Sequence, residues 1–171
     1  KAMYNEATQS GGRGGAVYIQ NCDHGNDNIT FTNSYFLNNT AGGNGGAIDW
    51  HKGASDGLVD NCTFKNNLAN RSGGSIYWSG INGTVKKSTF MHNMALGNVT
   101  DNIGGGDGGA ILWIGSLGLV DNCTFIDSNS ARRGGGAYMT GSDNVTYNNC
   151  KFINCTSGTN GGGLDWLAGA N

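Results

Sequence analysis

The chain has 171 residues, with 32 glycines, no proline and a formal net charge of −2. These numbers exclude a collagen-like chain, which needs proline and a three-residue glycine period, and a nucleic-acid-binding surface, which needs a basic stripe. No apolar run approaches the roughly 18 residues of a membrane span, and no amphipathic helix is indicated. The length and the recurring apolar residues fit one folded domain over 1–171.

The first of two alternating motifs is a glycine pair followed by a small residue and by apolar residues at alternate positions. Such alternation is the period of a β-strand, so Ile48 and Trp50 are expected to point inward together. The motif occurs at 15–19, 46–50, 74–78, 109–113, 135–139 and 162–166.

The second motif is asparagine, cysteine or serine, any residue, phenylalanine, and a second asparagine three positions later. It occurs at 33–39, 61–67, 87–93, 122–128 and 149–155, with Lys87, Ser128 and Cys155 as substitutions. Its phenylalanines are 28, 26, 35 and 27 residues apart, and the long step is explained by an insertion at 96–107, predicted to be a surface loop. A period of about 27 residues lies in the range of solenoid proteins.

The spacing inside the repeat predicts a corner. Val59 and Cys62 are both apolar and expected inside, yet three residues separate them, which breaks strand alternation. Asn61 lies between them, and asparagine tolerates the left-handed backbone that a sharp corner needs. Each repeat then supplies three short strands. We therefore predict an all-β fold, a right-handed parallel β-helix of about five to six coils with about 27 residues each.

Stacking of the coils converts recurring residues into columns roughly 4.8 Å apart from one coil to the next. The corner asparagines are expected to hydrogen-bond from side chain to backbone along their column, each bond contributing about 1 kcal/mol. Lys87 interrupts this column, which predicts a weaker or wider corner there. The predicted columns are Phe36, Phe64, Phe90, Phe125 and Phe152 inside, and Asn33, Asn61, Asn122 and Asn149 at the corner.

One column of the glycine-pair strands is predicted to face water, because aspartate or tyrosine occupies it in most coils. Exposed aromatic rings on a flat sheet could bind sugar rings or a partner surface, and cross-strand packing of tyrosine is the alternative. The candidate ligand-binding residues of this column are Tyr18, Asp49, Tyr77 and Tyr138.

Metal and catalytic sites are not indicated. The five cysteines lack the paired spacing of a zinc site, so no metal or cofactor is expected, and Cys62, Cys123 and Cys150 are expected to be buried thiols.

Asp49 and Asp165 share a column but lie four coils apart, roughly 19 Å, which is too far for a glycosidase pair. No catalytic residue is predicted, and a site built from different columns of one coil stays open.

Sequons for N-glycosylation recur along the chain. They would place glycans on surface loops if the protein is secreted by a host that glycosylates. The predicted acceptors are Asn28, Asn38, Asn70, Asn82, Asn98 and Asn144.

The two motifs together resemble the repeats of chlamydial polymorphic membrane proteins, and still more those of adhesin-like surface proteins of methanogenic archaea. The residues that carry the resemblance lie at 45–50 with 61–67, and at 108–113 with 122–125. The resemblance covers the whole chain and implies a right-handed β-helix on the cell surface that acts in attachment without a cofactor.

We therefore expect an extracellular, cell-surface protein, a rigid stalk or fibre subunit that mediates attachment. The expected partners are neighbouring repeats or second copies stacked head to tail, because the chain starts and ends within a coil, and a host or cell-surface glycan. Nucleic acid and a membrane span are not expected. The alternatives are a polysaccharide lyase or hydrolase on a β-helix scaffold and a carbohydrate-binding β-helix module.

Overall fold

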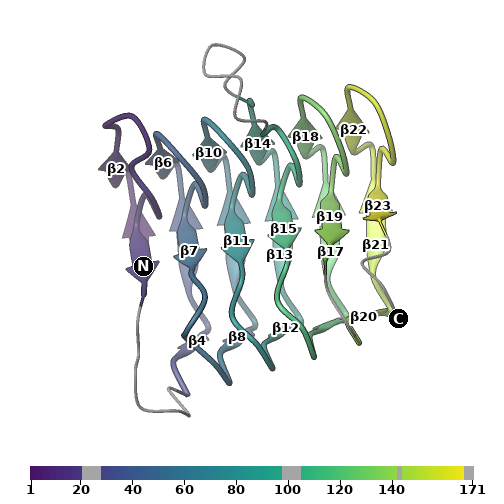
Figure 1. Ribbon diagram of the computed structural model, residues 1–171, viewed down its shortest axis with the longest axis horizontal. Helices are drawn as coiled ribbons and strands as arrows, with labels where there is room; N and C mark the ends of the chain where they lie inside the picture. Colours follow the sequence, from purple (N-terminus) through teal and green to yellow (C-terminus); the bar gives the residue numbers. More distant parts are fainter. Residues whose placement is uncertain (21–27, 98–104, 142–143, 168–171) are drawn as a thin grey trace.

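The computed structural model describes residues 1–20, 28–97, 105–141 and 144–167. The coils lie side by side along the long axis of the molecule, from the N-terminal coil to the C-terminal coil (Figure 1). Strands at equivalent positions of successive coils pair in parallel, and together they form four sheets, named A to D here. The predicted all-β parallel β-helix is confirmed.

Sheets A and B lie on either side of one corner. Sheet A contains β1 (Ala2–Met3), β5 (Tyr35–Leu37), β9 (Thr63–Lys65), β13 (Thr89–Met91), β17 (Thr124–Ile126) and β21 (Lys151–Ile153). Sheet B contains β2 (Glu6–Ala7), β6 (Thr40–Ala41), β10 (Leu68–Ala69), β14 (Met94–Ala95), β18 (Asn129–Ser130) and β22 (Thr156–Ser157).

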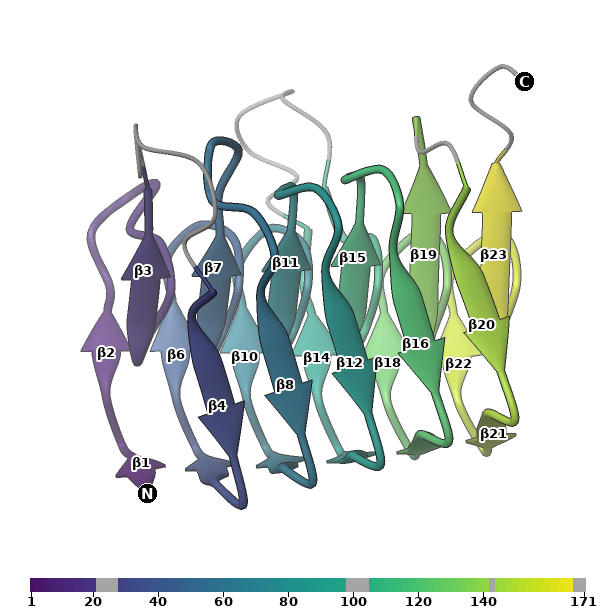
Figure 2. The same ribbon diagram turned by 90° about the horizontal axis from the view of Figure 1, so that it is seen from below.

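Sheets C and D complete each coil, and sheet D is in front in Figure 2. Sheet C contains β3 (Val17–Ile19), β7 (Ile48–Trp50), β11 (Ile76–Trp78), β15 (Ile111–Trp113), β19 (Ala137–Thr140) and β23 (Leu164–Leu167). Sheet D contains β4 (Thr30–Thr32), β8 (Leu58–Asp60), β12 (Thr84–Lys86), β16 (Leu119–Asp121) and β20 (Thr146–Asn148).

The three predicted strands per coil correspond to sheets C, D and A, and sheet B adds a fourth. Its strands have only two residues each, which is too short for an alternating pattern to appear in the sequence. A second corner separates it from sheet A, and the residue there again has a positive φ, as at Asn38 and Asn66, both with φ of 55°.

The interior is filled by columns of stacked rings. Neighbouring phenylalanine rings of sheet A lie 4.7–4.9 Å apart with interplanar angles of 4–7°. On sheet C, the Trp50 and Trp78 rings stack at 4.2 Å and the Trp78 and Trp113 rings at 4.7 Å. These three tryptophans are fully buried, so the inward parity expected for Trp50 is correct.

The corner asparagines adopt the expected left-handed backbone, with φ of 53° at Asn61 and 51° at Asn122. The side-chain hydrogen bond of Asn61 differs from the prediction, because its Nδ2 donates to Oδ1 of Asn33 at 2.7 Å and not to a backbone group. The Lys87 corner is not wider. Lys87 has φ of 50°, and its N–H donates to the Asp121 carbonyl at 2.9 Å, as in the other coils.

The continuous asparagine column lies instead at the last position of the second motif, and its members Asn39, Asn67 and Asn93 are buried. Nδ2 of Asn67 donates to the Phe36 carbonyl at 2.9 Å, and Oδ1 of Asn67 accepts from the Asn39 N–H at 3.0 Å. Each amide also donates to the next, from Asn5 to Asn39 at 2.8 Å and from Asn39 to Asn67 at 2.9 Å. The column satisfies backbone groups where sheet A ends.

The two positions of each glycine pair require glycine for different structural reasons. Gly45 has a positive φ of 65°, which residues with a side chain rarely adopt. Gly46 has an ordinary backbone, but a Cβ atom there would lie 2.0 Å from the Gly74 carbonyl oxygen of the next coil. The first glycine therefore makes the turn, and the second allows the coils to approach each other. Part of the predicted loop at 96–107, residues 98–104, lies outside the described residues.

Phe64→Ala is expected to lower the free energy of unfolding by about 3–5 kcal/mol, because the ring is fully buried between two others. Lys65→Ala, next to it on the exposed side of the strand, is expected to change stability by less than about 0.5 kcal/mol. Urea denaturation of both variants measures the difference. Equal effects would contradict the inward parity of sheet A.

Candidate functional site

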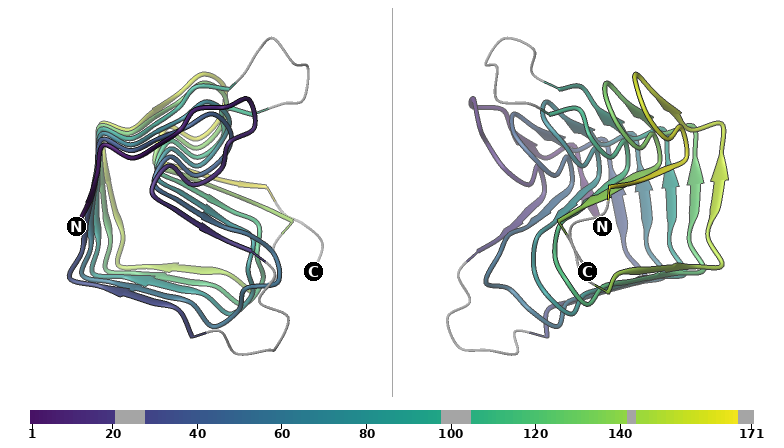
Figure 3. Two further views of the ribbon diagram at one scale, coloured as in Figure 1. Left: turned by 90° about the vertical axis from the view of Figure 1, so that its left-hand side faces the viewer. Right: turned by 45° about the vertical axis from the view of Figure 1, so that its right-hand side comes forward.

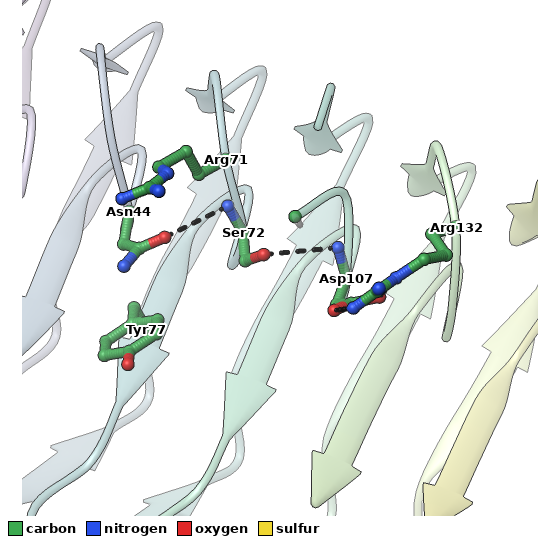
Figure 4. A pocket seen from close by; sticks show the side chains of 7 residues that line it. Asn44, Arg71, Ser72, Tyr77, Asp107 and Arg132 are labelled. Carbon is green, nitrogen blue, oxygen red and sulfur yellow. Dashed lines mark hydrogen bonds and ion pairs between the residues drawn. The ribbon is translucent and has the colours of Figure 1, made fainter. Parts of the chain in front are cut away.

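The outer surface is re-entrant where the chain passes from sheet B to sheet C. Seen end-on in Figure 3, the coils nearly superimpose, and the turns between these sheets fold back as a hook beside the outer face of sheet C. A cavity of about 400 Å³ lies there, within the ~300–1,000 Å³ range of ligand pockets. Its lining side chains are Asn44, Arg71, Ser72, Tyr77, Asp107 and Arg132 (Figure 4).

Three of these side chains occupy the same position of successive coils, directly before the glycine with positive φ. They are linked along the stack, because the Ser72 N–H donates to Oδ1 of Asn44 and the Asp107 N–H donates to Oγ of Ser72, both at 3.3 Å. Figure 4 shows Tyr77 below Asn44, on the opposite side of Ser72 from Asp107. One wall of the pocket is therefore a row of polar turn residues, and Tyr77 is contributed by β11.

The two arginines of the pocket have different surroundings. Arg132 forms a two-point ion pair with Asp107, in which Nε donates to Oδ1 at 2.8 Å and Nη2 donates to Oδ2. Arg71 has no carboxylate partner among the residues that the structure describes. The two arginines and one aspartate leave the pocket with a net positive charge, in a chain whose formal net charge is −2.

The prediction that Asp49 faces water is wrong. Its side chain lies on the outer face of sheet C but is fully buried, and neither carboxylate oxygen has a hydrogen-bond partner within the described part of the chain. The nearest basic side-chain atoms are Nη1 of Arg13 and Nδ1 of His51, each 3.9 Å from one carboxylate oxygen. Arg13 comes from the turn of the preceding coil, so the hook covers a column that would be exposed on a flat sheet.

The environment of Asp49 favours its protonated form. Burial raises the pKa of Asp49 from 3.8 to about 7, and the positive charge of Arg13 opposes this rise. The pKa of His51 is lowered by burial and by the charges of Arg13 and Lys52. Nη1 of Arg13 lies 2.8 Å from Nδ1 of His51, and the guanidinium can only donate, so Nδ1 accepts and the imidazole is neutral.

The tyrosines of the same column differ in exposure. Tyr18 is 42% exposed and donates to the Gln20 side chain at 2.5 Å. Tyr138 is buried and accepts from Arg133 at 3.0 Å, and the guanidinium carbon lies over its ring, 5.7 Å from the ring centroid. The expected exposure is therefore wrong for Tyr138.

Tyr77 is half-buried, and its pKa is raised by burial and by the charge of Asp49. It lines the pocket and lies opposite Asp49 in the register of β7 and β11. Asp49, Arg13 and His51 are called the Asp49 cluster below.

The structure places the predicted glycosylation acceptors in different settings. Three are exposed at turns before strands of sheet D, namely Asn28, Asn82 and Asn144. Two are half-buried, Asn38 at the second corner and Asn70 after β10, and Asn98 lies outside the described residues.

The thiols are partly as expected. Cys62 and Cys123 are buried free cysteines, and Cys150 is half-buried. In the described part of the chain, no three histidine, cysteine or acidic side chains gather closely enough to hold a metal ion. The same residues contain no helix with the length and apolarity needed to cross a membrane.

The sequence reasoning missed the polar turn residues of the pocket. Their signal is the position directly before the glycine pair, where Asn44, Ser72 and Asp107 occur in successive copies of the first motif. Arg71 and Arg132 each lie two residues before a glycine with positive φ. Sequence alone does not show that the turns fold back beside sheet C.

Asp49→Asn is expected to flatten the pH dependence of stability. The folded-state pKa of Asp49 is raised to about 7, so folding favours the protonated carboxyl group. The stabilisation that this protonated group gives the fold is complete below about pH 4 and is lost as the pH rises through 7. The loss is roughly 3–5 kcal/mol, and the amide variant should not show it. Urea denaturation of wild type and variant between pH 4 and 8 measures this, and parallel stability curves would show that Asp49 does not titrate in this range.

A family model described as a right-handed beta helix region matches residues 15–165. Searches of curated proteins and of solved structures found no match. The matched segment covers nearly the whole repeat array, and its described strands form the parallel coils seen in the structure. The chain belongs to the right-handed β-helix family.

Proposed function

We propose that this β-helix is an extracellular attachment protein that binds a glycan in the pocket between the sheet B–C turns and Tyr77. The single observation that carries the proposal is the pocket itself, in which a half-buried tyrosine ring lies among polar side chains. Ring faces bind the apolar faces of sugars, and the polar groups around them bind hydroxyls or charged substituents.

The β-helix supports this role by holding the pocket rigidly. The lining side chains come from four successive coils, so the site extends along the stack for roughly 14 Å at the strand spacing. A ligand that matches this shape is a chain of sugar rings lying parallel to the long axis. Each coil adds one turn residue to the wall, and a longer array of coils would extend the same surface.

The surface location is also part of the proposal. It is supported by the resemblance of the repeats to adhesin-like surface proteins, by the exposed sequons at Asn28, Asn82 and Asn144, and by the low content of charged residues, 13%. Neighbouring repeats or further copies of the chain, stacked head to tail, are proposed partners, because parallel β-coils pair through their strand edges.

We favour binding over polysaccharide cleavage. General acid–base catalysis needs a titratable group within reach of the substrate, and the Asp49 carboxylate is covered. Asp107 is the carboxylate among the pocket-lining side chains, and it is neutralised by Arg132. The pKa of Asp49, which burial raises to about 7, is the feature that favours an enzyme. Release of reducing or unsaturated ends from polysaccharides would establish cleavage.

Tyr77→Ala is expected to weaken glycan binding at least about tenfold, the factor that corresponds to about 1.4 kcal/mol, because the ring of the pocket is lost. Tyr35→Ala is the matched control, since Tyr35 is 52% exposed on sheet A, away from the pocket. A glycan array with the wild type and both variants measures the effect. Equal binding by the two variants would exclude the pocket as the binding site.

A further inference from the structure

We propose that the pocket selects glycans with an anionic substituent, a carboxylate or a sulfate, which Arg71 binds while a sugar ring packs on Tyr77. The inference rests on the proposed function and specifies its ligand. It depends on the charges of the pocket and of the Asp49 cluster.

The two arginines of the pocket differ in their partners. Arg132 is held by Asp107 through two hydrogen bonds, which also fixes the Asp107 carboxylate away from other ligands. Arg71 lines the same cavity, half-buried, with no carboxylate partner in the described residues. A guanidinium offers five donors in a planar fork that matches carboxylate and sulfate oxygens. Arg71 is therefore the group on which a ligand anion is expected.

The charges around Tyr77 are mainly positive. Arg13 and Arg71 both lie close enough to Tyr77 to lower its pKa, which opposes the rise caused by burial and Asp49. The charges of two arginines therefore act on Tyr77, one from the turn before β3 and one from the turn before β11. The His51 imidazole is neutral, so it adds no charge. An anion beside Tyr77 meets a positive field, whereas a cationic ligand would be repelled.

Asp49 is a buried acid on the strand next to Tyr77. Asp49 lies opposite Tyr77 in the register of β7 and β11, and its oxygens face Arg13 and His51. Its pKa of about 7 means that its negative charge develops between about pH 6 and 8. That charge opposes a ligand anion near Tyr77. Affinity for an anionic glycan should therefore fall as the pH rises, and affinity for a neutral glycan should not.

Isothermal titration calorimetry at constant ionic strength tests the inference with matched ligand pairs. The carboxylate pair is a galacturonic acid hexamer and its fully methyl-esterified form, and the sulfate pair is a sulfated galactan oligosaccharide and its desulfated form. The protein variants are wild type, Arg71→Gln, Arg71→Lys and Lys65→Gln. Lys65 is exposed on sheet A and gives the same change in net charge away from the pocket. Thermal unfolding checks that each variant is folded.

The expected result is that wild type binds the anionic member of at least one pair about tenfold or more tightly than its neutral member. Arg71→Gln should abolish that preference, Arg71→Lys should retain part of it, and Lys65→Gln should leave it unchanged. Whichever pair shows the preference identifies the carboxylate or the sulfate as the ligand group. Weaker anion binding at pH 8 than at pH 6, absent in Asp49→Asn, would support the role of Asp49.

Three results would overturn the inference. Equal binding of both members of each pair would reject anion selection and leave the proposed glycan binding intact. If the protein binds none of these glycans and no neutral glycan on an array, both the anion selection and the proposed glycan binding are rejected. An anion preference that survives in Arg71→Gln as fully as in Lys65→Gln would remove Arg71 from the site.

Discussion

Every coil of this protein depends on the coil beside it, because the backbone groups of each strand bond to the equivalent strand of the next coil. Strands in sheets A and C pair in parallel and in register along the array, for example Phe64 opposite Phe90 and Trp50 opposite Trp78. The same register stacks identical side chains at about the strand spacing, so one residue type is repeated along each column. Parallel coils of two- to four-residue strands would not be stable alone, and stacking supplies the buried area that they lack.

This constraint divides the sequence into two kinds of positions. Inward positions mostly repeat, since a different residue interrupts a column of rings or of hydrogen-bonded amides such as Asn39 and Asn67. Corners need only the left-handed backbone, which Lys87 adopts as Asn61 does. The turns between sheets B and C are released from this requirement, apart from their glycines. They carry Arg13, Asn44 and Asp107 at one and the same position of different coils. Chemical variety is therefore concentrated in the hook, and the pocket is found there.

The repeating part of the fold could be predicted from the sequence, and the variable part could not. The period of the phenylalanines predicted the inner column, and the break in alternation at Asn61 predicted the corner with its left-handed backbone. Sheet B was missed, since two residues per strand leave no periodic signal. Asp49 was expected to face water because strand parity says which face of a sheet a residue occupies, but parity cannot reveal that a turn folds back over that face.

A rigid array of coils carries a cationic, tyrosine-containing pocket on one side. In the proposed complex, Arg71 and Tyr77 together contact an anionic sugar. The most direct measurement is an NMR titration of ¹⁵N-labelled protein with a galacturonic acid hexamer and a sulfated galactan oligosaccharide. We expect one of these ligands to shift the Arg71 Nε–H signal and the backbone amides of Ser72 and Tyr77 most, with the sheet A amides unchanged. Shifts confined to sheets A and D, with no change at Arg71 or Tyr77, would show that the anionic sugar does not bind in this pocket.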